Sequence, residues 1–73
     1  MKRNIVDEIV KRPSPQGFYV IPVRREALTV LRELKGIDAV EEAGDTILVL
    51  IRSRSQARRL ATLFHRKGLL VEG

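Results

Sequence analysis

Cationic side chains gather in one stretch near the C-terminal end of the chain. Between Ile51 and Gly68 the sequence IRSRSQARRLATLFHRKG carries six Arg or Lys residues and no Asp or Glu. Positively charged side chains at this density attract polyanions. A phosphate backbone is a polyanion that Arg and Lys contact directly. The candidate phosphate-binding residues are Arg52, Ser53, Arg54, Ser55, Arg58, Arg59, Arg66 and Lys67.

The same stretch has the pattern of an amphipathic helix. Ser53, followed three residues later by Gln56, is typical of a helix N-terminus, and Gly68 stands where a helix commonly ends. The hydroxyl groups of Ser53 and Ser55 would add hydrogen-bond donors for one phosphate at the helix start. Apolar residues recur at helical spacing, so the cations point mostly elsewhere. The apolar side is made of Ala57, Leu60, Ala61 and Phe64.

The net charge of +5 comes from the C-terminal part of the chain. Residues 1–45 hold eight basic and eight acidic side chains, whereas residues 46–73 hold six basic and one acidic. Solvated helices usually mix the two signs, because oppositely charged residues four positions apart stabilise them. The one-sided charge therefore favours a polyanionic partner over an ordinary solvated face, with an acidic protein as the alternative partner.

Length and composition limit the class of protein. A chain of 73 residues forms one domain and buries only about 60% of its unfolded surface, so we expect oligomerisation to supplement its core. The absence of cysteine excludes disulfides and thiolate metal sites. Since there is neither a long apolar run nor a signal-peptide pattern, we expect no membrane span and a cytoplasmic location. The excess of Arg over Lys, with few Asn and Gln, indicates a thermophile.

Periodicity and turn residues predict an α+β fold. A helical arm is expected over residues 1–12, a linker over 13–17, and a single domain over 18–73. Within the domain we expect strands at 18–23, 37–42, 46–51 and 69–71, and helices at about 24–35 and 52–68. This βαββαβ order is that of a ferredoxin-like two-layer sandwich, here with an extra N-terminal helix.

The expected strand at residues 46–51 is apolar on both faces. The helices of a two-layer domain cover only one face of its sheet. The other face would leave Leu48 and Leu50 in water unless the N-terminal helix or a second subunit covers it. We therefore predict a homodimer or a higher homo-oligomer. The expected interface residues are Phe18, Tyr19, Leu48, Leu50, Ile5 and Ile9.

The sequence gives little support for catalysis or for a metal site. His65 is the only histidine, and the neighbouring acids Asp7–Glu8 and Glu41–Glu42 would diverge on a helix or a strand. There is no Gly-rich phosphate loop and no nucleophile motif. We therefore expect a protein that is not an enzyme and that needs no metal or cofactor.

Two resemblances to known families are carried by particular segments. GIDAVEEAGDTILVLI resembles the central hairpin of Lrp/AsnC-type regulatory domains and of ACT domains, which implies binding of a small ligand. EALTVLRELKGIDAVEEAGDTILVLIRSRSQARRLATLFHRKGLL is similar in its Arg-rich character to archaeal ThermoDBP-related proteins, which implies binding of single-stranded DNA. RNA-recognition motifs share the expected strand order, but residues 46–51 lack the aromatic side chain that would stack a base.

The leading hypothesis is a non-catalytic nucleic-acid-binding module that prefers a single strand of DNA or RNA. Its sequence preference should be weak, because few aromatics are available to stack bases and no base-reading motif is present. The alternatives are a regulatory or oligomerisation domain that binds a small ligand, and an accessory subunit of a larger complex.

Overall fold

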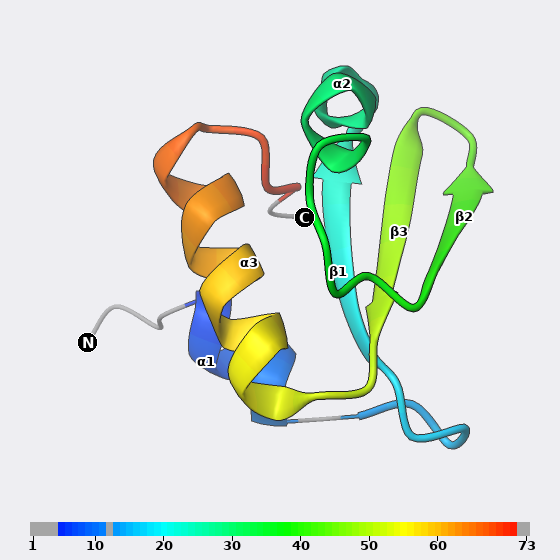
Figure 1. The fold of residues 1–73 in the computed structure, drawn as a ribbon, viewed down its shortest axis with the longest axis vertical. Helices are drawn as coiled ribbons and strands as arrows, with labels where there is room; N and C mark the ends of the chain where they lie inside the picture. Colours follow the sequence, from blue (N-terminus) through cyan, green and yellow to red (C-terminus); the bar gives the residue numbers. More distant parts are fainter. Residues whose placement is uncertain (1–4, 12, 72–73) are drawn as a thin grey trace.

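A computed structural model describes residues 5–11 and 13–71 of the chain. Three α-helices and three antiparallel strands make up this part, which confirms the predicted α+β class (Figure 1). None of these helices has the length and hydropathy needed to cross a bilayer. In chain order the elements are α1 (Ile5–Lys11), β1 (Tyr19–Arg24), the 3-10 helix η1 (Arg25–Ala27), α2 (Leu28–Leu31), β2 (Ala39–Ala43), β3 (Thr46–Ile51) and α3 (Arg54–Arg66).

The sheet has the strand order β1-β3-β2, so β3 is central. Its bounds are those predicted from the sequence, and β1 and β2 differ from the prediction by one or two residues at their ends. Both neighbours pair with β3 in antiparallel register. The register places Val20 opposite Leu50 and Pro22 opposite Leu48. Because successive side chains point to opposite faces, these four residues share one face of the sheet.

The strand expected at residues 69–71 is reduced to an isolated bridge between Leu70 and Val23. Two backbone bonds support it: Arg24 N–H donates to the Leu69 carbonyl at 2.7 Å, and Val71 N–H donates to the Pro22 carbonyl at 2.9 Å. Only one residue pair is bridged, which is too few for a regular strand. The βαββαβ order is therefore not confirmed, and the described residues give helix, strand, helix, strand, strand, helix.

The helix expected over residues 24–35 is much shorter than predicted. It consists of η1 and the single turn α2, and it tightens beyond Leu31, where Leu34 N–H donates to the Leu31 carbonyl at 3.2 Å. No side chain caps the start of either segment. The β-branched residues Thr29 and Val30 also lower the helix propensity. Residues 32–38, called the 32–38 loop below, instead connect α2 to β2.

One core lies between the helices and one face of the sheet. α1 packs alongside α3 in this helix layer (Figure 1). It contributes Val6, Ile9 and Val10 to the same core, so it does not cover the opposite face of the sheet. The fully buried side chains of the sheet are Ile21, Val23, Ile47, Val49 and Ile51, and those of α3 are Ala57, Ala61 and Phe64, with Leu60 nearly so.

The opposite face of the sheet, called the open face below, carries no helix in the described part of the chain. Its apolar side chains are half-buried. The turn that precedes β1 reaches over one end, where Ser14 and Gln16 help to line a hollow of about 350 Å³. The open face therefore presents a partly covered apolar surface to solvent. Its apolar residues are Phe18, Val20, Pro22, Leu48 and Leu50.

Candidate nucleic-acid interface

α3 begins where the sequence predicts. Ser53 is its N-cap, and the Ser53 hydroxyl accepts a hydrogen bond from Gln56 N–H at 3.3 Å. The hydroxyl oxygens of Ser53 and Ser55 lie 3.2 Å apart. The Gln56 side chain is used elsewhere, because its Nε2 donates to the Lys35 carbonyl at 3.1 Å. Ser53 and Gln56 therefore form only one of the two hydrogen bonds of a capping box. The Gln56 side chain, which would make the second bond, instead connects the 32–38 loop to α3.

Arg52 connects the end of β3 with the start of α3. Its backbone N–H donates to the Asp38 carboxylate at 2.8 Å. Its guanidinium carbon lies 5.0 Å from the centre of the Phe18 ring, within the range of a cation–π contact. Arg54, the first residue of α3, is exposed. The predicted cations at the start of the helix are therefore accessible, with one carboxylate held beside them.

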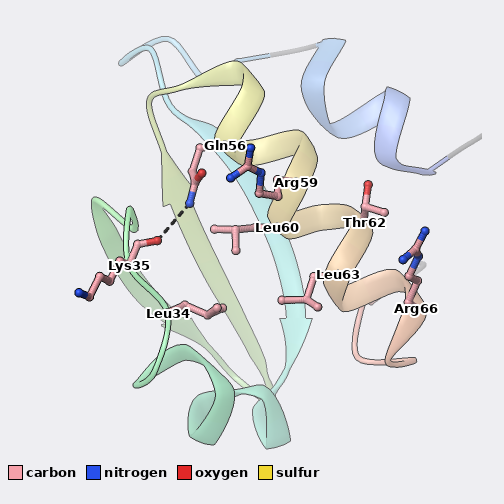
Figure 2. Close-up of a pocket in the computed structure, with 8 residues that line it drawn as sticks. All are labelled: Leu34, Lys35, Gln56, Arg59, Leu60, Thr62, Leu63 and Arg66. Carbon is pink, nitrogen blue, oxygen red and sulfur yellow. Dashed lines mark hydrogen bonds between the residues drawn. The ribbon is translucent and has the colours of Figure 1, made fainter.

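The helix divides the remaining cations between two flanks. Successive residues of an α-helix are turned by about 100°, so Arg58 and Arg59 point in different directions. Arg58 faces α1, where its Nη1 lies 2.8 Å from Asp7 Oδ1. Arg59 lines the groove on the other flank together with Leu60 and Leu63, and Arg66 lines it from the outer side of α3, away from the loop (Figure 2). The predicted cationic stripe is therefore split into an α1 flank and a loop flank. Lys67, the C-cap residue, is exposed at the end of the helix.

The loop flank forms a groove of about 510 Å³ between α3 and the 32–38 loop (Figure 2). Its apolar lining consists of Leu34, Leu60 and Leu63. Arg59 lies near the Gln56 end of the groove, Arg66 lies two helical turns further along, and the side chain of Lys35 extends away from α3. Among the described residues, neither Arg59 nor Arg66 is within ion-pair distance of a carboxylate. The groove thus combines an apolar lining with uncompensated positive charge.

The groove was not predicted from the sequence. Leu34 and Lys35 were expected inside a helix, and Gln56 was interpreted only as part of a cap. The sequence signal nearest the groove is Gly36, which marks the end of the expected helix and, with a φ of +86°, places the chain close to Gln56. A Cβ atom at this position would lie 2.6 Å from Gln56 Nε2. The loop therefore approaches α3 closely at the one residue that lacks a side chain.

The residues predicted as an oligomer interface lie on two sides of the sheet. Phe18, Leu48 and Leu50 lie on the open face. Tyr19 is paired with Ile51 and packs against the core, as does Ile5. Ile9 is a core residue with 9% of its surface exposed. Because α1 joins the helix layer, only Phe18, Leu48 and Leu50 share a surface on which a second copy of the chain would lie.

Acidic side chains lie at the edge of the sheet away from α3. Glu41 and Glu42 belong to the edge strand β2, which Figure 1 shows on the far side of the sheet from α3. Arg25 is paired with Glu42 at 3.2 Å and donates to the Gly44 carbonyl at 3.4 Å. Within the described residues, no three His, Cys, Asp or Glu side chains cluster in a way that would hold a metal ion. The exposed side chains along α3 are therefore mainly cationic, whereas β2 carries acidic side chains, one of which is paired with Arg25.

Comparison of the chain with protein-family models, with curated proteins and with solved structures finds no significant match. The resemblances to ThermoDBP-related proteins, Lrp/AsnC-type domains and ACT domains therefore stay predictions.

Proposed function

We propose that this chain is a non-catalytic nucleic-acid-binding module that contacts the phosphate backbone through α3 and the residues at its two ends. One observation carries the proposal. Of the six exposed cations on this surface, only Arg58 has a carboxylate within ion-pair distance in the described part of the chain. The six cations are Arg52, Arg54, Arg58, Arg59, Arg66 and Lys67.

The position of the first two cations adds support, because a helix start is an unfavourable place for positive charge. Arg52 and Arg54 lie beside the positive end of the helix macrodipole, where a cation is unfavourable by about 0.3 to 1 kcal/mol. The first turn of α3 contains no acidic residue, and Asp38, which accepts from the Arg52 N–H, is the carboxylate described at this end of the helix. A bound phosphate would be favoured by the same partial charge and by both guanidinium groups.

Sequence preference should be weak, because the three aromatic side chains offer no platform for bases on α3. Phe64 is fully buried. Tyr19 packs against the core, and Phe18 lies beneath the guanidinium of Arg52. Binding would then come mainly from phosphate contacts, which fix position without reading the bases.

The test is fluorescence anisotropy with labelled single-stranded DNA, duplex DNA and RNA across a salt series. Changing Arg54, Arg58 and Arg59 together to Gln should lower the slope of log affinity against log salt by up to about 2, since each phosphate contact contributes about 0.7 to 0.9 and Arg58 is already paired with Asp7. The fold should persist, because the side chains that hold α3 in place are unchanged. Circular dichroism checks this point.

A matched control changes three exposed cations outside α3, namely Arg24, Arg25 and Arg32, to Gln. This triple variant has the same net charge as the first, so it should keep most of the affinity if α3 is the binding surface. Equal losses in the two variants would show that only net charge matters. Absence of any binding near 50 mM salt, where backbone contacts are strong, would contradict the proposal.

We also propose that a second copy of the chain covers the open face. The support is that α1 lies in the helix layer, which leaves Phe18, Leu48 and Leu50 partly in contact with water. Leu50→Asp should weaken self-association by roughly 30-fold or more, as expected for a central interface residue. Val40→Asp is the control, because Val40 is 44% exposed on the other face of the sheet. Light scattering that finds a stable wild-type monomer at micromolar concentration would exclude this interface.

The ferredoxin-like arrangement is likewise a proposal. It is supported by the antiparallel neighbours of β3 and by the bridge from Val23 to Leu70, which lies where a fourth strand would pair with β1. Hydrogen exchange tests it. The amides of Arg24 and Val71 should be protected to nearly the same extent as those of β3, and rapid exchange at both would contradict a fourth strand.

A further inference from the structure

We infer that the groove between α3 and the 32–38 loop holds a base of a single nucleic-acid strand, with phosphates of that strand bound by Arg59 and Arg66. The inference rests on the proposed function and makes it more specific. It assigns the groove as a base-binding subsite, and it predicts that the protein selects unpaired bases over a duplex.

The lining of the groove requires an occupant with an apolar body. Its volume of about 510 Å³ falls within the range of small-molecule sites, which is about 300 to 1,000 Å³. Leu34 and Leu63 are half-buried and border the groove from opposite sides, and Leu60 lies between them (Figure 2). The flat face of a base can pack between such aliphatic side chains, as it does with apolar side chains in pockets that hold extruded bases.

The charges beside the groove require that the occupant is also anionic at more than one point. Arg59 and Arg66 are seven residues apart on α3, which is about 10.5 Å along the helix axis. Arg59 lies near the Gln56 end of the groove, Arg66 lies further along on the outer side of α3, and neither is neutralised by a described carboxylate. A strand running along the helix would meet both guanidinium groups in succession, with one base directed between them onto the leucines.

Two other polyanions fit the groove less well. In duplex DNA the faces of the bases are stacked within the helix, so phosphates could reach Arg59 and Arg66 while the leucines stayed in water. A peptide made only of Asp and Glu carries its charge on short side chains that bring no apolar body to the groove. A single strand provides both parts of the required chemistry, and contact with the face of a base is tolerant of its identity.

The experiment compares a fluorescein-labelled thymidine strand with a strand of the same length in which every base is replaced by an abasic tetrahydrofuran unit. Both strands carry the same phosphates. The wild-type protein should bind the thymidine strand about fivefold more tightly than the abasic strand, because a base that packs on the leucines removes apolar surface from water. The two salt slopes should agree, because both strands offer the same phosphates.

Variants separate the two parts of the subsite. Leu63→Asn should lower the affinity for thymidine to that for the abasic strand and leave the latter unchanged. Arg66→Gln should lower both affinities and both salt slopes. Leu28→Asn is the matched control, since Leu28 is a half-buried leucine of α2 outside the groove, and it should preserve the difference between strands. If Leu63→Asn lowers the helix signal in circular dichroism, Leu63→Ala replaces it.

The outcomes distinguish this inference from the proposed function. Equal, salt-dependent binding of both strands to the wild-type protein would leave backbone binding intact and overturn the base subsite. If neither strand binds, both proposals fail. Labelled polyglutamate provides a third comparison. The inference is overturned in favour of an acidic peptide if polyglutamate binds, if Leu63→Asn weakens that binding, and if the protein does not prefer the thymidine strand to the abasic strand.

Discussion

The two flanks of α3 place neighbouring residues of the same type in different surroundings. Arg58 faces α1 and is paired with Asp7, and the side chains of this pair are 50% and 53% exposed. Arg59 faces the 32–38 loop, where it borders an apolar groove and has no described carboxylate partner. Charge in the sequence is therefore not the same as charge available to a ligand. What packs beside each flank decides the difference.

The two flanking segments also differ in how they pack against α3. α1 brings Val6, Ile9 and Val10 into the core and closes its flank. The 32–38 loop contacts α3 through the bond between Gln56 and Lys35, and it leaves the rest of its flank as a groove. A ligand would approach the loop flank without displacing any core contact.

Phe64→Ala should have the largest effect, because Phe64 is 0% exposed and anchors α3 beneath both flanks. Loss of a buried phenyl ring costs about 3 to 5 kcal/mol of unfolding free energy, which is a large part of the stability of a domain of this size. Urea denaturation followed by circular dichroism measures it. Leu63→Ala is the neighbouring control on the loop flank, and its half-buried side chain should cost only about 1 kcal/mol. If both variants lost the same unfolding free energy, Phe64 would not be the residue that anchors α3 in the core.

Gly36→Ala should weaken the loop flank alone. A side chain at φ +86° is strained, and its Cβ would lie 2.6 Å from Gln56 Nε2. Gln56 can move aside, but its bond to the Lys35 carbonyl would then be lost, so we expect a total cost of about 2 kcal/mol from strain and the lost bond. Gly17→Ala is the control, because Gly17 has a φ of +87° and no atom within 4 Å of the added Cβ.

The difference in unfolding free energy between the two glycine variants isolates the contribution of the hydrogen bond between Gln56 and the Lys35 carbonyl. The denaturant midpoints of both variants give this difference when the denaturant dependence of stability is the same in both. We expect Gly36→Ala to lose about 1 kcal/mol more than Gly17→Ala. Identical losses would show that the Gln56 side chain does not hold the loop in solution, and the groove would then lack a fixed wall.

Features that depend on neighbours in the sequence were predicted well. β3 has its predicted bounds because its apolar run is continuous and a Gly–Asp turn precedes it directly. The start of α3 at Ser53 follows from a capping residue whose partner is three positions away. In both cases the residues that decide the structure lie within one segment, so the local pattern is sufficient.

Features that depend on distant residues were not predicted. Arg58 is paired with a residue 51 positions away, and Gln56 is bonded to a residue 21 positions away. No spacing rule reports such contacts, so the division of the cations and the groove were visible only in the structure. The helix at residues 24–35 was overestimated for a related reason. Its apolar spacing was helical, but Leu34 is used as part of the groove rather than as the next turn of a helix.

Arg59→Gln and Arg58→Gln compare the flanks directly. If a strand lies on the loop flank, Arg59→Gln should lower the slope of log affinity against log salt by about 0.7, the contribution of one phosphate contact on a single strand. Arg58→Gln should lower it by clearly less, because Arg58 is already paired with Asp7. Anisotropy titrations at several salt concentrations measure both slopes. Equal changes would mean that the ion pair does not restrain Arg58 when nucleic acid binds.

Asp7→Asn should have the smallest effect, and it tests the same ion pair from the other side. Both side chains are about half exposed, so solvent screens the pair and its loss should cost at most about 0.2 to 1 kcal/mol of unfolding free energy. The released Arg58 becomes available to phosphate. Affinity for a single strand should therefore rise modestly, and the salt slope should increase by less than about 0.7.

The control for this last change is Asp45→Asn, which alters net charge equally at the turn between β2 and β3, away from α3. If Asp7 acts by holding Arg58, only Asp7→Asn should raise the salt slope, and the gain should vanish when Arg58→Gln is added. If both Asn variants raise affinity alike, the gain reflects net charge alone. If Asp7→Asn leaves affinity and stability unchanged, the pair does not form in solution, and Arg58 is as available to a ligand as Arg59.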